Sequence, residues 1–116
     1  MGYESRVYLV DVHRYEDWVW PETIAQVRMA KMCDDAWYKL FAKDIDYTLT
    51  ADDGNTPFDT DMYGEHLKSC PVGDAVAYLE ERMKTDPYRR LPLLYGLLAG
   101  INPEQWEHLE LVHFGY

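Results

Sequence analysis

The stretch RVYLVDVH, residues 6–13, decides the fold that we predict for this chain of 116 residues. Side chains alternate between the two faces of a β-strand. One face would carry Val7, Leu9 and Asp11, and the other Tyr8, Val10 and Val12. Apolar β-forming residues on both faces are typical of a central strand that is covered on its two sides. We therefore expect a sheet with structure packed above and below this strand.

Two further stretches alternate in the same way. Residues 109–116 (LELVHFGY) end the chain, and residues 44–50 place Ile45, Tyr47 and Leu49 on one face. Strands at the two ends of a small domain usually share one sheet. We predict a single α+β domain over residues 1–116. Its small, mostly antiparallel sheet would contain the N- and C-terminal strands plus one middle strand, packed by helices.

The remaining apolar residues follow helical spacing. Pro21 suits the first turn of a helix, and the stripe that follows consists of Ala25, Met29, Met32, Ala36 and Leu40. This helix runs either unbroken over residues 21–41 or as two helices, with the second capped by Asp34 or Asp35 after a stop near Cys33.

Further along the chain, Asp74 is expected to cap a helix over residues 75–84. Asp86 and Pro87 would start another helix that ends at Gly100. Asn102 would cap a last short helix. Residues 56–70 are polar and predict no regular structure.

The composition restricts the possible partners. Twenty-one carboxylates oppose 11 lysines and arginines, which gives a net charge of −10. Such a chain is repelled by nucleic acids and by anionic membranes, so we predict neither as a direct partner. The longest apolar stretch, residues 91–101, is too short to cross a bilayer. Basic protein surfaces are the natural charged partners. Only two cysteines, Cys33 and Cys70, favour a reduced protein of the cytoplasm.

Residues 44–65 form an acidic segment that contains no lysine or arginine. Its seven carboxylates are Asp44, Asp46, Asp52, Asp53, Asp59, Asp61 and Glu65. Phe58 and Tyr63 lie among them. Carboxylates can steer a basic partner while aromatic rings anchor it, and we take these nine residues as the candidate partner-binding site. The alternative interpretation is a solvated hairpin that keeps the chain soluble.

The acidic segment also resembles the start of a calcium-binding loop. Asp59, Asp61 and Gly64 occupy loop positions 1, 3 and 6 of an EF-hand. Position 12, which needs a bidentate carboxylate, is Cys70. We therefore predict no metal site and no cofactor.

Histidines offer one catalytic alternative. If the first and last strands are neighbours, His13 and His113 would face each other beside Asp11 and form an acid–base or metal pair. Ordinary histidines at strand ends are the simpler interpretation. We predict that the protein is not an enzyme, and a small metal-dependent hydrolase is kept as an alternative.

The two chain ends carry a resemblance. The opening MGYESRVY and the ending LVHFGY resemble the ends of small uncharacterised accessory proteins of phages and prophages. This resemblance implies an accessory protein that acts in the host cytoplasm. By analogy, small acidic phage proteins block host nucleic-acid-binding proteins, including CRISPR effectors. Our leading hypothesis is thus an acidic protein, monomer or homodimer, that binds a basic surface of a host or phage protein. A self-assembling structural phage protein is a further alternative.

Overall fold

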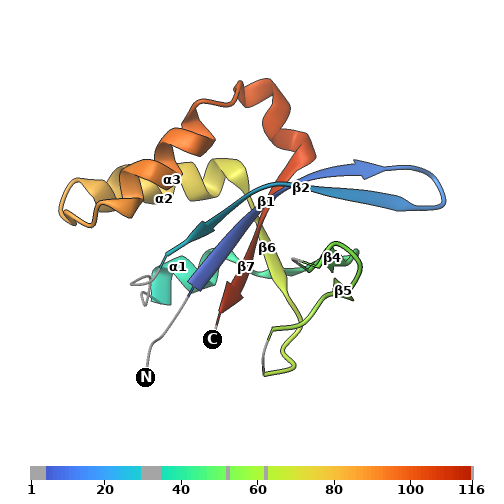
Figure 1. The fold of residues 1–116 in the computed structure, drawn as a ribbon. Helices are drawn as coiled ribbons and strands as arrows, with labels where there is room; N and C mark the ends of the chain where they lie inside the picture. Colours follow the sequence, from blue (N-terminus) through green and yellow to red (C-terminus); the bar gives the residue numbers. More distant parts are fainter. Residues whose placement is uncertain (1–4, 30–34, 52, 62, 116) are drawn as a thin grey trace.

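The computed structural model describes residues 5–29, 35–51, 53–61 and 63–115. Its centre is a five-stranded antiparallel sheet in the order β2-β1-β7-β6-β3 (Figure 1). These strands are β1 (Ser5–Arg14), β2 (Val19–Arg28), β3 (Lys43–Asp44), β6 (Lys68–Pro71) and β7 (Leu109–Gly115). A separate antiparallel hairpin joins β4 (Leu49–Thr50) to β5 (Pro57–Phe58). The predicted α+β fold with a mostly antiparallel sheet is confirmed.

The first and last strands lie side by side, as predicted. β1 and β7 pair from Ser5 opposite Gly115 to Asp11 opposite Leu109. Both faces of β1 are buried: Val7 and Leu9 belong to one apolar core, and Tyr8 and Val10 belong to a second. β1 is therefore the central strand that its two apolar faces indicate.

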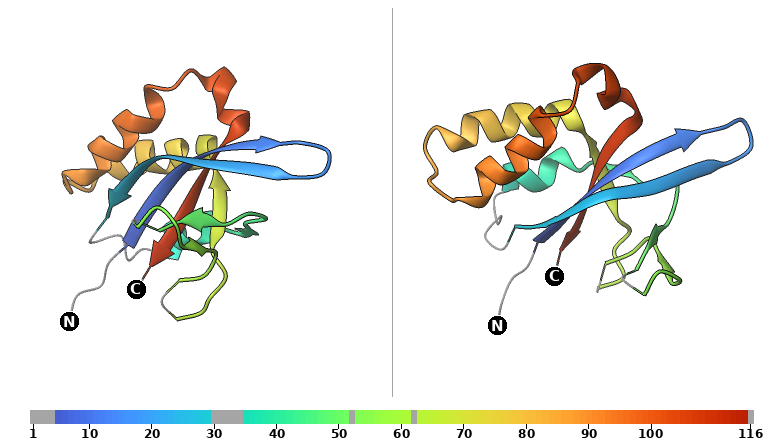
Figure 2. Two further views of the ribbon diagram at one scale, coloured as in Figure 1. Left: turned by 45° about the vertical axis from the view of Figure 1, so that its right-hand side comes forward. Right: turned by 45° about the horizontal axis from the view of Figure 1, so that its top comes forward.

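Helices cover one face of the sheet (Figures 1 and 2). They are α1 (Asp35–Leu40), α2 (Val72–Met83), α3 (Arg90–Ala99) and the 3₁₀-helix η1 (Pro103–His108). Trp37 of α1 is fully buried with Leu79 of α2 and Leu94 of α3. The predicted cap at the last helix is present, since the side chain of Asn102 accepts a hydrogen bond from the backbone N–H of Glu104. Within the described residues, no helix is long and apolar enough to cross a membrane.

The other face of the sheet is covered by the chain between β3 and β6. Ile45, Tyr47 and Leu49 are buried there against Tyr8 and Val10. Their alternation predicts one strand over residues 44–50. Instead, the two ends of that stretch pair separately, because β3 joins β6 and β4 joins β5. The apolar side is nevertheless the one that the alternation indicates.

The helix predicted from residue 21 is wrong over its first part. Residues 19–28 form β2, which pairs with β1 along its whole length. Ala25 and Met29 fit helical spacing, but Ala25, Val27 and Met29 also alternate and pack on the helix-covered core. A shift in register between Leu9 and Val10 interrupts the alternation of β2. The second of the two alternative helices is present as α1, while Cys33 and Asp34 lie outside the described residues.

Three other boundaries differ from the prediction. α2 begins at Val72 rather than at residue 75, directly after β6. α3 begins at Arg90, because the Asp86 carboxylate accepts the backbone N–H of Tyr88 in a turn that precedes the helix. Part of the stretch predicted as irregular forms β5 and β6. The polar sequence of β6 becomes a strand because it lies between β7 and β3.

A hairpin extends from the sheet beyond the helices. We call residues 11–22, the far ends of β1 and β2 with their connection, the aromatic arm (Figures 1 and 2). The backbone N–H of Tyr15 donates to the carbonyl of Trp18 at 2.8 Å and closes the turn. Most residues of this arm are exposed.

Candidate functional site

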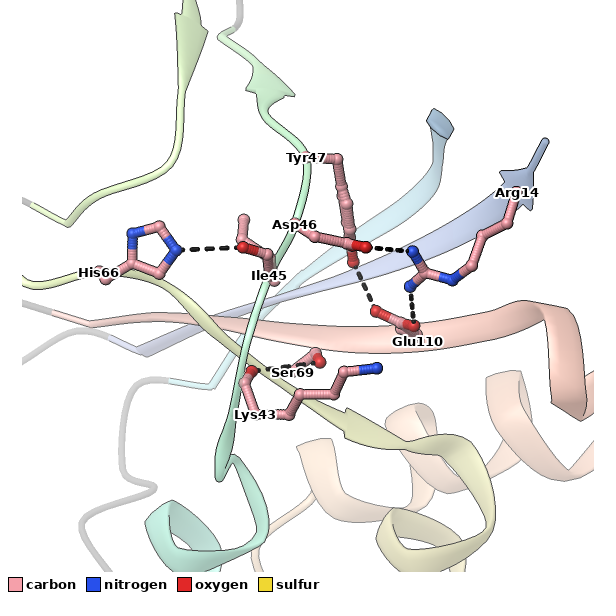
Figure 3. Close-up of polar contacts among 8 residues, drawn as sticks. All are labelled: Arg14, Lys43, Ile45, Asp46, Tyr47, His66, Ser69 and Glu110. Carbon is pink, nitrogen blue, oxygen red and sulfur yellow. Dashed lines mark hydrogen bonds and ion pairs between the residues drawn. The ribbon is translucent and has the colours of Figure 1, made fainter. Parts of the chain in front are cut away.

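Arg14 fastens the acidic segment to the sheet. Its guanidinium contacts Asp46 Oδ2 at 2.5 Å and Glu110 Oε2 at 2.8 Å (Figure 3). The hydroxyl of Tyr47 donates to the other Glu110 oxygen at 2.8 Å. The hydrogen bond from Arg14 lowers the pKa of the Asp46 carboxyl, while burial and the Glu110 charge raise the pKa of Tyr47. Asp46 therefore already forms an ion pair with an arginine of the same chain.

Three contacts hold the start of the segment against β6. The His66 ring N–H donates to the carbonyl of Ile45 at 3.1 Å, and the Ser69 hydroxyl donates to the carbonyl of Lys43 (Figure 3). Lys68 Nζ lies 3.0 Å from Asp44 Oδ1 and lowers the pKa of that carboxyl through this hydrogen bond. Asp44 thus also forms an ion pair within the chain.

Two aspartates in the segment build turns. Oδ1 of Asp53 accepts the backbone N–H groups two and three residues later, and Oδ1 of Asp61 accepts those two and four residues later. The hydrogen bond from the Thr56 hydroxyl lowers the pKa of Asp53, and the backbone N–H groups add to this effect. Gly54 and Gly64 supply the positive φ values, +78° and +80°, that the turns require. The loops therefore depend on these two carboxylates.

The nine predicted partner-binding residues consequently have different roles. Asp44 and Asp46 are in ion pairs, Asp53 and Asp61 hold turns, and Asp52 lies outside the described residues. Among the residues described, no lysine or arginine forms an ion pair with the other four described carboxylates of the segment, two of which are the turn aspartates. These are Asp53, Asp59, Asp61 and Glu65. Tyr63 stands out between them with 76% of its surface exposed.

Phe58, which is predicted to anchor a partner, forms part of the wall of a pocket. Its ring packs edge-on against Tyr8 and Phe114, with centroid distances of 6.1 and 5.9 Å. These three rings line a pocket of about 330 Å³, together with Ala51, Thr60 and Asp61 of the acidic segment and with Arg6 of β1. This volume lies at the lower end for ligand pockets.

The paired histidine site is wrong. β1 and β7 are neighbours, but His113 lies opposite Val7, six residues along β1 from His13. Six residues of strand span about 20 Å. His13 Nε2 instead lies 3.2 Å from Asp11 Oδ2 on its own strand. Within the described residues, no three His, Cys, Asp or Glu side chains are grouped as a metal would need.

The side chain of His113 is partly buried beside the helix-covered core. Its Nε2 lies 2.6 Å from Ser5 Oγ, and its ring contacts Tyr38 and Phe41. Burial lowers the pKa of His113 to about 4. A serine beside a histidine is the usual arrangement of an activated nucleophile, but Ser5 has no exposed surface. The pair therefore stabilises the junction of β1 and β7.

Cys70 is buried, free and surrounded by apolar side chains, as predicted for a small hydrophobic residue. Burial raises the pKa of its thiol to about 12, so the reactive thiolate is disfavoured. Cys33 lies outside the described residues.

A group of aromatic residues on the arm was not identified from the sequence. Tyr15 and Trp18 are stacked with centroids 4.4 Å apart, and Trp20 meets Trp18 edge-on at 6.0 Å. About half of each ring-bearing residue is exposed. The signal was the stretch YEDWVW, residues 15–20, where two acidic turn residues separate aromatics on either side. The predicted helix from Pro21 concealed the hairpin.

Comparison with known proteins adds no assignment. No protein-family model, curated protein or solved structure matches this chain.

Proposed function

We propose that this chain is an acidic accessory protein of phage or prophage type. It binds a basic surface of a host or phage protein in the host cytoplasm and thereby blocks that surface, as an inhibitor of a nucleic-acid-binding or defence protein of CRISPR type would. It has no catalytic role in this proposal. The supporting observation is a group of four carboxylates in the acidic segment that the described lysines and arginines leave unpaired.

The anchoring of the segment favours binding. Asp53 and Asp61 accept backbone hydrogen bonds, which fix the loops of the acidic segment, including the one that carries Tyr63 and Glu65. A surface that is already ordered loses less conformational entropy when a partner docks. The internal network of Arg14 holds this surface against the sheet and takes no part in binding itself.

The aromatic pocket supplies the second element of an interface. Hot spots are apolar side chains that fill well-packed pockets, surrounded by polar groups. Tyr8, Phe58 and Phe114 form apolar walls beside Asp61. The partner in this proposal therefore presents one apolar side chain among lysines and arginines.

The experiment uses the protein immobilised and exposed to lysate of its host, with bound proteins released by a salt gradient and identified by mass spectrometry. The test variant is Asp59→Asn with Glu65→Gln, because Asp53 and Asp61 are needed for the turns. Glu107→Gln, an exposed carboxylate of η1, is the matched control. We expect one basic protein that wild type and control retain and that the double variant releases at clearly lower salt.

Two results would contradict the proposal. Equal retention of every captured protein by the double variant would mean that the acidic segment does not bind. Capture of the chain itself alone would favour the self-assembling alternative. The exposed aromatics of the arm are the observation on which that alternative depends, and sedimentation at several protein concentrations measures it.

A further inference from the structure

The β1–β2 hairpin, which includes the aromatic arm, exposes large apolar groups that the fold does not use. Within the described residues, six large hydrophobic side chains are prominently exposed, and Tyr15, Trp18, Trp20 and Ile24 are four of them. All four lie on the β1–β2 hairpin or its connection. None belongs to either apolar core. Grouped exposed aromatics of this kind mark interaction sites more often than scattered single residues do.

The charge around these rings has one sign. The arm carries the carboxylates of Asp11, Glu16, Asp17 and Glu22, and its only lysine or arginine is Arg14. The guanidinium of Arg14 is held by Asp46 and Glu110 outside the arm. The aromatic arm is therefore an anionic surface built around two indoles and a phenol.

Two of these carboxylates face each other. Asp11 and Glu22 are direct partners in the β1–β2 register, and the next pair on the same face is His13 with Trp20. Like charges at opposed positions destabilise a strand pair. His13 approaches Asp11, but no described lysine or arginine pairs with Glu22. A cation placed beside Trp20 would offset this repulsion.

The backbone edge of the arm is poorly suited to strand pairing. β2 is the edge strand of the sheet, yet Pro21 lacks an N–H group and the register shift near Val10 bends the ladder. Prolines and bulges are common protections against edge-to-edge association. Recognition at the arm is thus expected to use its side chains rather than an added strand, which argues against a second copy of this chain as the occupant.

We propose that the aromatic arm binds an arginine-bearing segment of a partner protein. A guanidinium stacks on one exposed indole face of the perpendicular Trp18–Trp20 pair, contacts the edge of the other indole, and pairs with the nearby carboxylates. Charge complementarity carries the choice of partner, because a membrane with anionic lipids or a nucleic acid would be repelled by the same four carboxylates. The rings and carboxylates of this surface lie outside the acidic segment, which the arm touches through Arg14, and the inference does not depend on the proposed function of that segment.

The test follows the four indole N–H signals in a ¹H–¹⁵N NMR spectrum during titration with a hexa-arginine peptide at low salt. Trp18 and Trp20 are about half exposed on the arm, whereas Trp37 is buried and Trp106 is partly buried. We expect saturable shifts of the two arm indoles and unchanged signals from the other two. Trp18→Ala and Trp20→Ala assign the signals and are each expected to weaken binding at least tenfold.

Controls separate this proposal from simple charge attraction. Leu93→Ala removes an exposed hydrophobic side chain from α3 and is expected to leave the affinity unchanged. Hexa-lysine, which lacks the planar guanidinium, is expected to bind several times more weakly. Asp59→Asn with Glu65→Gln removes carboxylates of the acidic segment and is expected to leave the arm shifts in place. If only this last variant abolishes binding, the peptide occupies the acidic segment, and the arm proposal fails while the proposed function stands.

Three further results would overturn the inference. These are unchanged affinity in both tryptophan variants, no saturable shift of the arm indoles at millimolar peptide, and shifts that depend on protein concentration without peptide. The last result would identify a second copy of the chain as the occupant. Melting curves of the variants confirm that they are folded, so that a loss of binding reports on the surface.

Discussion

The acidic segment and the aromatic arm use their side chains in opposite ways. In the acidic segment Ile45, Tyr47 and Leu49 are buried in a core, and several carboxylates form contacts within the chain. In the arm the aromatic residues are exposed, and the one arginine, Arg14, forms ion pairs with residues outside the arm. A run of charged residues in a sequence can therefore stabilise the fold, while a run of aromatic residues can lie exposed on the surface. Substitutions in the two regions are therefore expected to differ in their effect on the free energy of unfolding.

The largest expected effect is on the buried side of the acidic segment. Leu49→Ala removes a side chain that is 2% exposed between the segment and β1. We expect it to lower the free energy of unfolding by about 2–5 kcal/mol in urea titrations. Leu93→Ala, at 67% exposure, is the control and should change it by less than about 0.5 kcal/mol. Similar values for both variants would show that the segment is not docked on the sheet.

Acid is expected to weaken the core beside the acidic segment. The folded pKa of His113 is about 4, below the ordinary value of 6.5, so the unfolded chain binds a proton more readily between these pH values. Stability from this group is complete above pH 6.5 and is lost as the pH falls to 4, by up to about 3 kcal/mol. Urea titrations across this range measure the loss.

The same experiment on two variants isolates the partly buried histidine. His113→Gln keeps a hydrogen-bonding group near Ser5 and should flatten the pH dependence between 6.5 and 4. His108→Gln removes a mostly exposed histidine and should keep the wild-type slope. An unchanged slope in His113→Gln would assign the acid sensitivity to other groups.

A smaller effect is expected at the contact between the two regions. Arg14→Met removes the partner of Asp46 and of Glu110, whose side chain is only 19% exposed. Because Arg14 itself is 38% exposed and screened by solvent, we expect a loss of about 1–2 kcal/mol that shrinks in high salt. Lys84→Met, in an exposed ion pair with Glu81, should leave the melting temperature unchanged. A melting temperature that Arg14→Met does not lower would mean that this network does not support the segment.

The smallest effect is expected on the arm. Trp20→Ala removes a large residue that is 54% exposed and lies outside both cores. We expect the free energy of unfolding to change by about 0.5 kcal/mol or less. A loss as large as that of Leu49→Ala would show that the aromatic group is structural, and would remove the contrast between the two regions.

Much of the fold was predictable where the chain is buried on two faces. Residues 6–13 and 109–115 carry apolar side chains on both faces of a strand, and they lie in the paired central strands β1 and β7. β2 was missed because it is an edge strand with half-exposed side chains, and a register shift breaks its period of two. β6 carries almost no strand signal of its own and is formed by its neighbours β7 and β3.

The sequence predicted which residues belong to the candidate site but not what each of these residues does. The sequence identifies the carboxylates of residues 44–65, yet it contains no sign that Asp46 meets Arg14 across 32 residues or that Glu110 joins them. The turn aspartates are visible locally, beside Gly54 and Gly64. The arm was not predicted because Pro21 suits both the first turn of a helix and an edge strand, and the sequence was interpreted as a helix.

The neighbouring positions of β1 and β7 have a consequence for synthesis. Ser5 and His113 touch although 108 residues separate them. A ribosome adds about 5–20 residues per second, so β1 emerges about 5–20 seconds before β7 can pair with it. During that interval β1 has only its hairpin partner β2, and its other edge and much of its apolar surface stay open. A chain that stops before residue 109 lacks the strand that closes the sheet, so unfinished copies would be substrates for chaperones and proteases rather than weaker versions of the complete protein.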